Sequence, residues 1–138
     1  MLQERDYVLI SSETPLISNL NMLENIALIP EVHQRMSIIK AECLALEKLK
    51  ILGLETIAKK RIVACSMEEI FYVMYIRAFM MQKQKVIIKV PYTITESLKD
   101  IQSIIKQMIK IQENQQIIIL DVLSNAIHYK GTLCNIIK

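Results

Sequence analysis

The stretch VACSMEEIFYVMYIRAFMMQKQKVIIKVPYTITESL, residues 63–98, decides the fold of this chain. Ser66 and, three residues later, Glu69 form the pattern of a capping box, which predicts a helix over Met67–Gln82. This helix is apolar and rich in methionine. The simplest interpretation is that its apolar face belongs to the core, and the alternative is that an exposed part of it forms a docking surface. The β-branched run Lys85–Val90 follows and is typical of a buried parallel strand. The stretch therefore predicts an α/β core.

On the N-terminal side, the sequence predicts a short strand and a second helix. Four β-forming residues indicate the strand, at Asp6–Ser11, because charged and turn residues bound them. The helix is predicted over Val32–Leu52, and Gly53 is typical of the residue that follows a helix end. Its apolar face is indicated by residues that recur every three or four positions, namely Met36, Ile39, Cys43, Leu46 and Leu49.

On the C-terminal side, a strand–helix–strand unit is predicted. A helix over Thr95–Glu113 carries a wide apolar face opposite its lysines, and Gln116–Leu120 reads as another buried strand. Two parallel strands joined by a helix form a crossover unit. A last strand is predicted at Thr132–Ile137.

Composition favours one folded domain over residues 1–138. The chain is 52% hydrophobic with 2 Gly and 3 Pro, and its net charge is +3. Few aromatic residues and no arginine cluster disfavour nucleic-acid binding. The three cysteines are widely spaced, as expected of reduced thiols in the cytosol. No apolar run reaches membrane-spanning length, so we expect a cytoplasmic protein, with peripheral attachment to the inner face of the membrane as an option.

The order of these features resembles the ATPase subunits of ABC transporters. Ser66 and Glu69 match two positions of that family's signature motif, Arg77-Ala78 match the dipeptide at the end of its signature helix, and Pro91 matches the turn after its Walker B strand. Residues 16–30, LISNLNMLENIALIP, resemble the segment that follows the family's Q-loop, and they are similar to the lipid-trafficking systems of the Mla type.

The resemblance implies a truncated P-loop-NTPase-like, three-layer α/β fold. Its sheet would be short and mainly parallel, with three or four strands, and flanked by helices. Residues 1–15 and 84–138 would form the sheet part, and residues 16–83 the helical subdomain with the signature-like helix. The sequence has no Gly-x-x-x-x-Gly-Lys-Ser/Thr motif, so the resemblance covers the later part of a family domain. Without a Walker A strand beside it, the strand at 117–120 would have a bare edge, which the last strand, a second copy or a partner chain would cover.

Two of the family's phosphate-facing elements are altered. Ser12, or alternatively Ser11, falls where the family has the Q-loop glutamine, and its side chain is too short to reach as far. Met67 and Glu68 replace the signature glycines, whose backbone amides approach the γ-phosphate held by the opposite subunit. Side chains there would crowd that approach, and the carboxylate of Glu68 would repel phosphate. Ser66 and Glu69 also have a purely structural interpretation, because a serine and a glutamate at this spacing are favoured at the start of any helix.

The positions that correspond to metal and water activation are altered as well. Lys89 stands at the Walker B aspartate and Val90 at the catalytic glutamate; a cation repels Mg²⁺, and valine cannot accept a proton. Lys89 is most simply a strand-end lysine that reaches solvent, although an ammonium could also replace the metal and hold a phosphate. Glu96 stands at the D-loop aspartate, and Asp121 or Leu120 at the γ-phosphate-contacting histidine.

These observations lead to one main hypothesis and two alternatives. The main hypothesis is a catalytically inactive ABC ATPase-like subunit or regulator that binds an ABC permease or an intact ATPase subunit through its helical subdomain, or forms a homodimer. We expect no bound ATP, Mg²⁺ or other metal, and no nucleic-acid partner. The first alternative is a nucleotide-binding protein or enzyme with a site relocated to residues such as Lys89, Asp121 or Glu69. The second is a homo-oligomeric interaction module, the folded product of a decayed gene.

Overall fold

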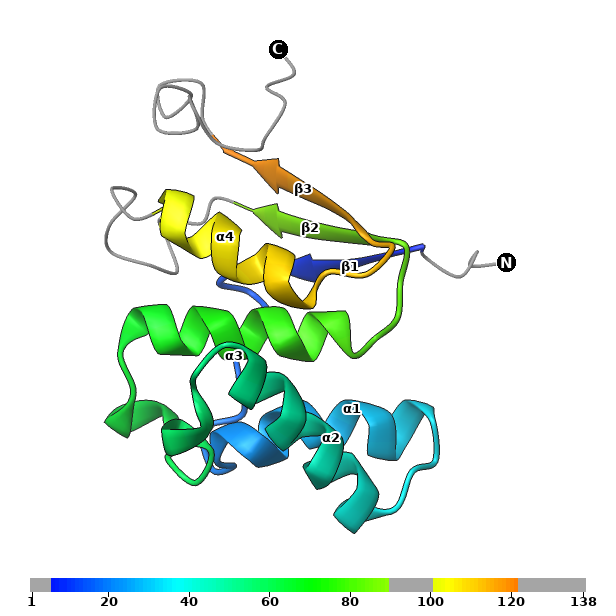
Figure 1. Cartoon of the computed structure of the whole chain (residues 1–138), viewed down its shortest axis with the longest axis vertical. Helices are drawn as coiled ribbons and strands as arrows, with labels where there is room; N and C mark the ends of the chain where they lie inside the picture. Colours follow the sequence, from blue (N-terminus) through cyan, green and yellow to red (C-terminus); the bar gives the residue numbers. More distant parts are fainter. Residues whose placement is uncertain (1–5, 90–100, 122–138) are drawn as a thin grey trace.

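The computed structural model describes residues 6–89 and 101–121 of the chain (Figure 1). Its elements along the sequence are β1 (Tyr7–Ile10), α1 (Met22–His33), α2 (Ile38–Ile51), the 3₁₀ turns η1 (Glu55–Ile57) and η2 (Ile62–Ala64), α3 (Met67–Phe79), β2 (Lys85–Lys89), α4 (Ile101–Ile111) and β3 (Gln116–Leu120). The predicted strands at 6–11, 85–90 and 116–120 are confirmed over their described residues. So is the helix predicted to start at Met67.

The three strands form one open, parallel sheet in the order β1-β2-β3. In the central row of the sheet, Leu9 pairs with Ile87, and Ile87 pairs with Ile118. Within the described ranges β3 pairs with β2 alone, and Leu120 at its end is exposed. The strand predicted at Thr132–Ile137 lies outside the described residues. The fold is therefore of the expected α/β type, with three parallel strands described.

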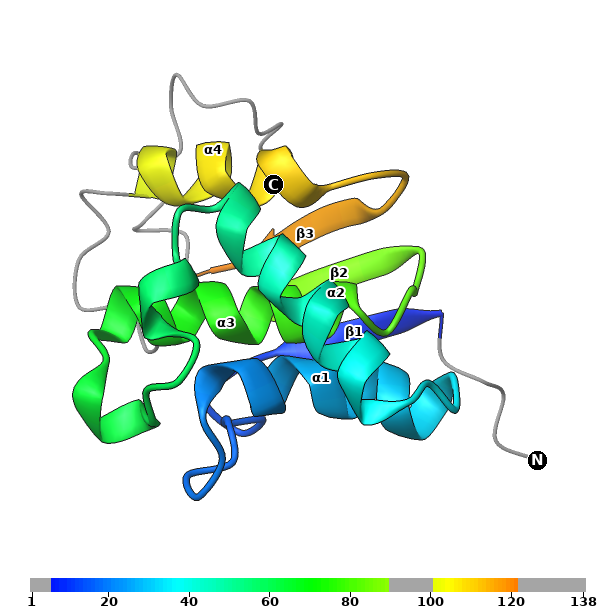
Figure 2. The ribbon, with the colours of Figure 1, turned by 60° about the horizontal axis from the view of Figure 1, so that its bottom comes forward.

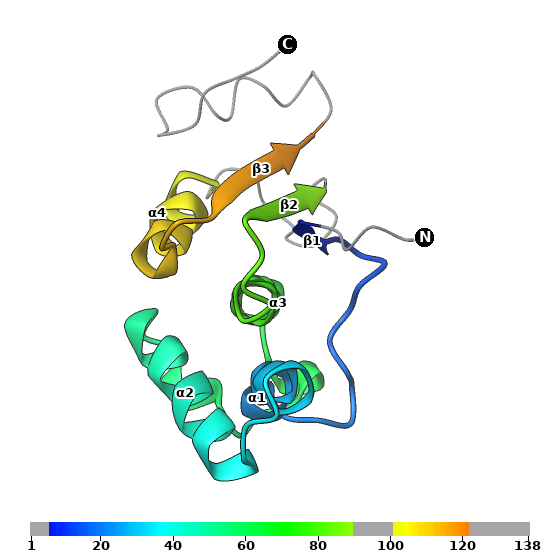
Figure 3. The ribbon, with the colours of Figure 1, turned by 90° about the vertical axis from the view of Figure 1, so that its right-hand side faces the viewer.

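Both α3 and α4 lie on one face of the sheet, and α1 and α2 pack beyond α3 (Figure 3). The alternation of the strands explains this face. Val86 and Ile88 of β2 are buried against the helices, whereas Lys85 and Lys89 on either side of them are exposed and Ile87 between them is half-buried. The main core therefore extends from the sheet through α3 to α1 and α2.

The central helix α3 is buried around most of its surface. Each side chain from Phe71 to Ile76 is buried, and so are Ala78 and Phe79. The hydroxyl of Tyr75 donates a hydrogen bond of 3.2 Å to the backbone carbonyl of Met108 in α4, and burial raises the pKa of this phenol. Met74 is buried as well, so the methionine-rich helix is core, and the alternative of a docking surface along it does not apply to these residues.

A buried asparagine shapes the segment between β1 and α1. The side-chain oxygen of Asn25 accepts a hydrogen bond from the Ile17 amide at 2.8 Å, and its Nδ2 donates to the carbonyls of Ile17 and Asn21 at 3.1 and 3.0 Å. Asn21 and Glu24 form a capping box at the start of α1. Both the oxygen and the nitrogen of the Asn25 side chain thus have hydrogen-bond partners, which allows this polar side chain to be buried.

Arg77, in the last turn of α3, anchors the loop after β1. Its guanidinium donates to the carbonyl of Pro15 at 2.9 Å and to the carbonyl of Thr14. The side chain is half-buried, and this desolvation lowers the pKa of the guanidinium. A contact between residues more than 60 positions apart thus ties the sheet to the helical layer.

The predicted apolar face of the second helix is correct for Leu49, which is buried, and for Met36 and Leu46, which pack against the core, but it is wrong for Ile39 and Cys43. Two helices occupy this region, because α1 ends at His33 and α2 begins at Ile38. The face of α2 that packs against α1 consists of Ala41, Ala45 and Leu49, whereas Ile39 is 79% exposed and Cys43 is exposed. Small residues allow the two helices to approach closely, so the buried stripe follows alanines instead of the larger side chains. Gly53 does follow the helix end, with φ of +71°.

We predict opposite stability effects for two substitutions on α2. Ala45→Leu should lower the free energy of unfolding by about 1–3 kcal/mol, because it overfills the contact with α1. Ile39→Ser should change it by less than about 0.5 kcal/mol, because that side chain faces solvent. Urea unfolding monitored by circular dichroism measures both values. A larger loss for Ile39→Ser than for Ala45→Leu would contradict the observed face.

A second prediction concerns Arg77. Arg77→Met should lower the free energy of unfolding by about 2 kcal/mol, since it removes two hydrogen bonds from a charged donor. Arg77→Lys should cost less than the methionine variant but should not restore full stability, because an ammonium lacks the planar fork that reaches two carbonyls. Equal stability of the wild type and Arg77→Met in urea titrations would show that the loop is held by other contacts.

Candidate functional site

The first group of predicted site residues lies at the carboxyl edge of the sheet. All three strands are parallel, so their carboxyl ends meet at one edge, which is where ligands commonly bind in α/β folds. Ser11 and Ser12 follow β1, Lys89 ends β2, and Asp121 follows β3. The fold thus brings these four residues to the same edge.

The two serines at this edge differ in their surroundings. Ser12, the residue predicted at the Q-loop position, is exposed. Ser11 is buried, and its Oγ accepts a hydrogen bond from the Glu13 amide at 3.2 Å, while its own amide donates to Thr14 Oγ1 at 3.1 Å. The buried hydroxyl therefore closes a local turn.

The remaining predicted residues of the edge are only partly described. Lys89 is exposed at the end of β2, and Asp121 is half-buried. Val90, Pro91 and Glu96 lie outside the described residues. Of the predicted residues that the structure describes, Lys89 thus brings an exposed ammonium to the edge and Asp121 a carboxylate, from neighbouring strands.

The second group of predicted residues forms the start of α3. Ser66 Oγ accepts a hydrogen bond from the Glu69 amide at 3.1 Å, and Glu69 Oε1 accepts one from the Ser66 amide at 2.8 Å. Glu68 Oε1 accepts a hydrogen bond of 3.0 Å from the hydroxyl of Tyr72. Met67 is exposed. The helix start thus carries two carboxylates, which the helix dipole stabilises in the first turn.

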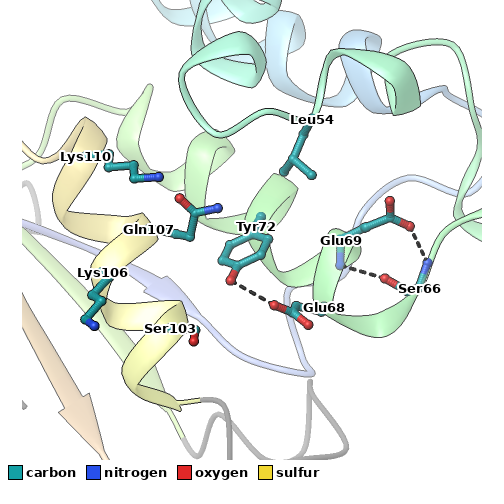
Figure 4. Close-up of a pocket in the computed structure, with 9 residues that line it drawn as sticks. All are labelled: Leu54, Ser66, Glu68, Glu69, Tyr72, Ser103, Lys106, Gln107 and Lys110. Carbon is teal, nitrogen blue, oxygen red and sulfur yellow. Dashed lines mark hydrogen bonds between the residues drawn. The ribbon is translucent and has the colours of Figure 1, made fainter.

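A cavity of about 710 Å³ lies between the start of α3 and the polar face of α4 (Figure 4). Ser103, Lys106, Gln107 and Lys110 of α4 lie at helical spacing and share one face, so they line one wall. The full lining consists of these four and of Leu54, Ser66, Glu68, Glu69 and Tyr72. Ser12, Lys89 and Asp121 are not part of this lining. The second group of predicted residues therefore faces a cavity that the first group does not reach.

The cavity has walls of opposite charge. Glu68 and Glu69 come from α3, whereas Lys106 and Lys110 come from α4. Gln107 Nε2 donates to the carbonyl of Leu52 at 3.4 Å, and its Oε1 is buried without a hydrogen bond from the described residues. Sequence reasoning missed the α4 residues. The one feature of the sequence that could have indicated them is their helical spacing, which does not show that the start of α3 lies across the cavity from them.

Cys65, just before α3, has the character of a structural cysteine. Burial raises the pKa of its thiol, the charge of Glu69 raises it further, and Lys60 opposes this effect. A raised pKa disfavours the thiolate, so nucleophilic chemistry at this position is disfavoured.

Two further findings concern metals and membranes. Among residues 6–89 and 101–121, no group of three His, Cys, Asp or Glu side chains is arranged to hold a metal ion. No helix within these ranges combines the length and the apolar character needed to span a membrane.

The sequence matches no protein-family profile and no curated protein. The fold does match solved structures. One is the ATP-binding cassette MJ0796 in a dimeric, post-hydrolysis state bound to ADP and Pi, with 21% sequence identity and a TM-score of 0.63. The match covers 86% of this chain and 53% of that protein, so the chain spans about half of its length. The fold of this chain is therefore that of part of an ABC ATPase.

We predict that Ser66→Ala lowers the free energy of unfolding by about 1 kcal/mol, because it removes the side-chain cap of α3. Ser18→Ala is the matched control, because Ser18 is an exposed loop serine and its substitution should change stability by less than about 0.5 kcal/mol. Chemical denaturation of the three proteins measures the difference. Equal values for both variants would mean that the capping box contributes nothing to the fold.

Proposed function

We propose that this chain is a catalytically inactive ABC ATPase-like subunit or regulator that associates with an ABC transporter complex. The fold, shared with part of an ABC ATPase, supports the family assignment. The main support for inactivity is the start of α3. In the family this helix start faces phosphate, whereas in this chain the side chains of Ser66 and Glu69 cap it.

A helix N-terminus attracts phosphate through its free amides and its dipole. At the start of α3, Ser66 Oγ already accepts the Glu69 amide, and the Glu69 carboxylate accepts the Ser66 amide. The carboxylate of Glu68 stands in the same turn and adds negative charge. An incoming phosphate would meet two carboxylates and would have to displace a formed cap, so we expect it not to bind.

The end of β2 supports the same proposal. Lys89 stands there as an exposed cation at the position that corresponds to the family's metal-binding aspartate. An ammonium repels Mg²⁺, whose preferred ligands are carboxylate and phosphate oxygens. The chain's own residues therefore do not favour the Mg²⁺ that phosphoryl transfer requires.

The partner we propose is an ABC permease, an intact ATPase subunit, or both, bound through the helical subdomain at the inner face of the membrane. The dimeric state of the similar cassette makes a second copy of this chain a further candidate. A lipid-trafficking complex of the Mla type is the narrower form of this proposal.

A second candidate function is a nucleotide- or small-ligand-binding protein with a relocated site. The cavity beside α3 favours it, because its volume lies in the usual range for ligand sites and it presents Lys106, Lys110 and a buried acceptor on Gln107. The two glutamates on the opposite wall count against a polyphosphate.

The first test is thermal unfolding of the purified chain with Mg-ATP and with metal-free ATP. We expect no change in melting temperature with either ligand. A bound nucleotide at 100–1,000 times its Kd would stabilise the fold by roughly 2.7–4.1 kcal/mol, which is easily detected. A stabilisation lost on Lys89→Ala would place a nucleotide at the sheet edge, and one lost on Lys106→Ala would place it in the cavity; either result would overturn the expectation that this chain binds no nucleotide.

The second test is copurification of the tagged chain from detergent extracts of its own cells. We expect an ABC permease or an intact ATPase subunit to copurify with it, identified by mass spectrometry. Arg77→Met provides a control for retention by unfolded protein. Recovery of the chain without any ABC component would overturn the association.

A further inference from the structure

The connection between α1 and α2 carries an exposed group of aliphatic side chains. We call residues 32–40 the α1–α2 corner. Within it, Val32, Ile38 and Ile39 are 63%, 62% and 79% exposed. The corner is the turn between α1 and α2 (Figures 1 and 2), and Figure 3 shows this turn at the end of the molecule opposite the sheet. Three large exposed aliphatic residues thus fall within one short connection, and such concentrations of exposed apolar side chains are typical of interaction sites.

The charged side chains within the corner are cationic. Arg35 and Lys40 are exposed cations, His33 is exposed, and there is no Asp or Glu between Val32 and Ala41. The flanking acids, Glu31 and Glu42, are half-buried. The surface that projects thus combines aliphatic side chains with cations.

Arg35 occupies a backbone conformation that usually belongs to glycine. Its φ is +51°, in the left-handed region, which is unfavourable for a residue that carries a side chain. Among the described residues, its guanidinium makes no hydrogen bond or ion pair, so the fold itself does not use this side chain. The exposed guanidinium is therefore free to contact a partner.

The corner is also held in place. The Met36 amide donates to the carbonyl of Pro30 at 3.1 Å, and Ser37 Oγ accepts the Lys40 amide at 3.3 Å to cap α2. Met36 packs against the core. These contacts present the exposed side chains in a fixed arrangement, which lowers the entropy lost on binding.

We propose that the α1–α2 corner binds the surface of an anionic lipid bilayer. The aliphatic side chains enter the boundary between headgroups and acyl chains, and Arg35 and Lys40 contact lipid phosphates. Charge complementarity favours an anionic bilayer as the partner. Arg35 and Lys40 lie beside the exposed aliphatic residues, and segments that bind at a lipid interface combine cations with apolar side chains in this way. This inference does not depend on the proposed ABC association.

The basic loop before α3 is a less suitable surface. Lys59, Lys60 and Arg61 are exposed there, but Val63 is the one large exposed aliphatic residue among them. The carbonyl of Lys60 accepts the Met22 amide at 2.9 Å, so this loop serves the start of α1.

The test is sedimentation of the full chain with vesicles of phosphatidylcholine alone and of phosphatidylcholine mixed with phosphatidylglycerol. We expect binding to the anionic vesicles that weakens as salt is raised. Ile39→Ser should weaken it on the order of tenfold, because less apolar surface is buried. Arg35→Gly should weaken it about fivefold, as expected for one cation.

Two controls separate binding from folding. Ile109→Ser replaces an exposed isoleucine of α4 and should bind like the wild type. Arg35→Gly should shift the melting temperature by less than about 4 °C, because relief of the left-handed strain offsets the greater freedom of glycine in the unfolded chain. A merely structural role of Arg35 would instead lower the melting temperature and leave vesicle binding of the folded fraction unchanged.

Three results would overturn the proposal. The first is no sedimentation with anionic vesicles, and the second is equal binding by Ile39→Ser and Ile109→Ser. The third is copurification of an ABC component that is lost on Ile39→Ser while vesicles are not bound, which would assign the corner to a protein partner. In that last case the proposed function would stand and the lipid inference would fail.

Discussion

The burial of α3 is the constraint on which the rest of the structure depends. A helix with an unbroken run of apolar side chains from Phe71 to Ile76 has no face that water can cover. The sheet and α4 cover one side, and α1 and α2 cover the other. The few polar groups that enter this layer are matched: the Tyr75 hydroxyl reaches a carbonyl of α4, and the Arg77 guanidinium reaches two carbonyls of the loop after β1.

The two ends of α3 have different chemistry. At its C-terminal end, a cation satisfies carbonyls of another segment. At its N-terminal end, the amides and the dipole would suit an anion, but Ser66 and Glu69 cap the helix from within the chain. Internal caps and external phosphate compete for the same donors. In this chain the amides of Ser66 and Glu69 at the start of α3 are already bonded to the chain's own side chains.

The charged and polar residues that could contact a ligand thus lie on separate surfaces. The carboxyl edge of the sheet brings together Ser12, Lys89 and Asp121, while the cavity beside α3 brings together the carboxylates of α3 and the lysines of α4. Among residues 6–89 and 101–121, neither surface has three His, Cys, Asp or Glu side chains placed to hold a metal ion. The exposed aliphatic corner between α1 and α2 lies elsewhere again, at the helical end, where a partner could bind without approaching the sheet edge.

The sequence by itself determined the features that depend on neighbours within one or two turns of chain. The cap at Ser66, the β-branched strands and the left-handed Gly53 are local, so the residue types specify them directly. The buried face of α2 is different, because Ala41 and Ala45 are buried by the close approach of α1, and hydrophobicity alone favoured Ile39. The lysines of α4 likewise face Glu68 across a cavity although some forty residues separate them. Only tertiary structure decides such contacts, since the packing of one helix against another selects which side chains lose their water.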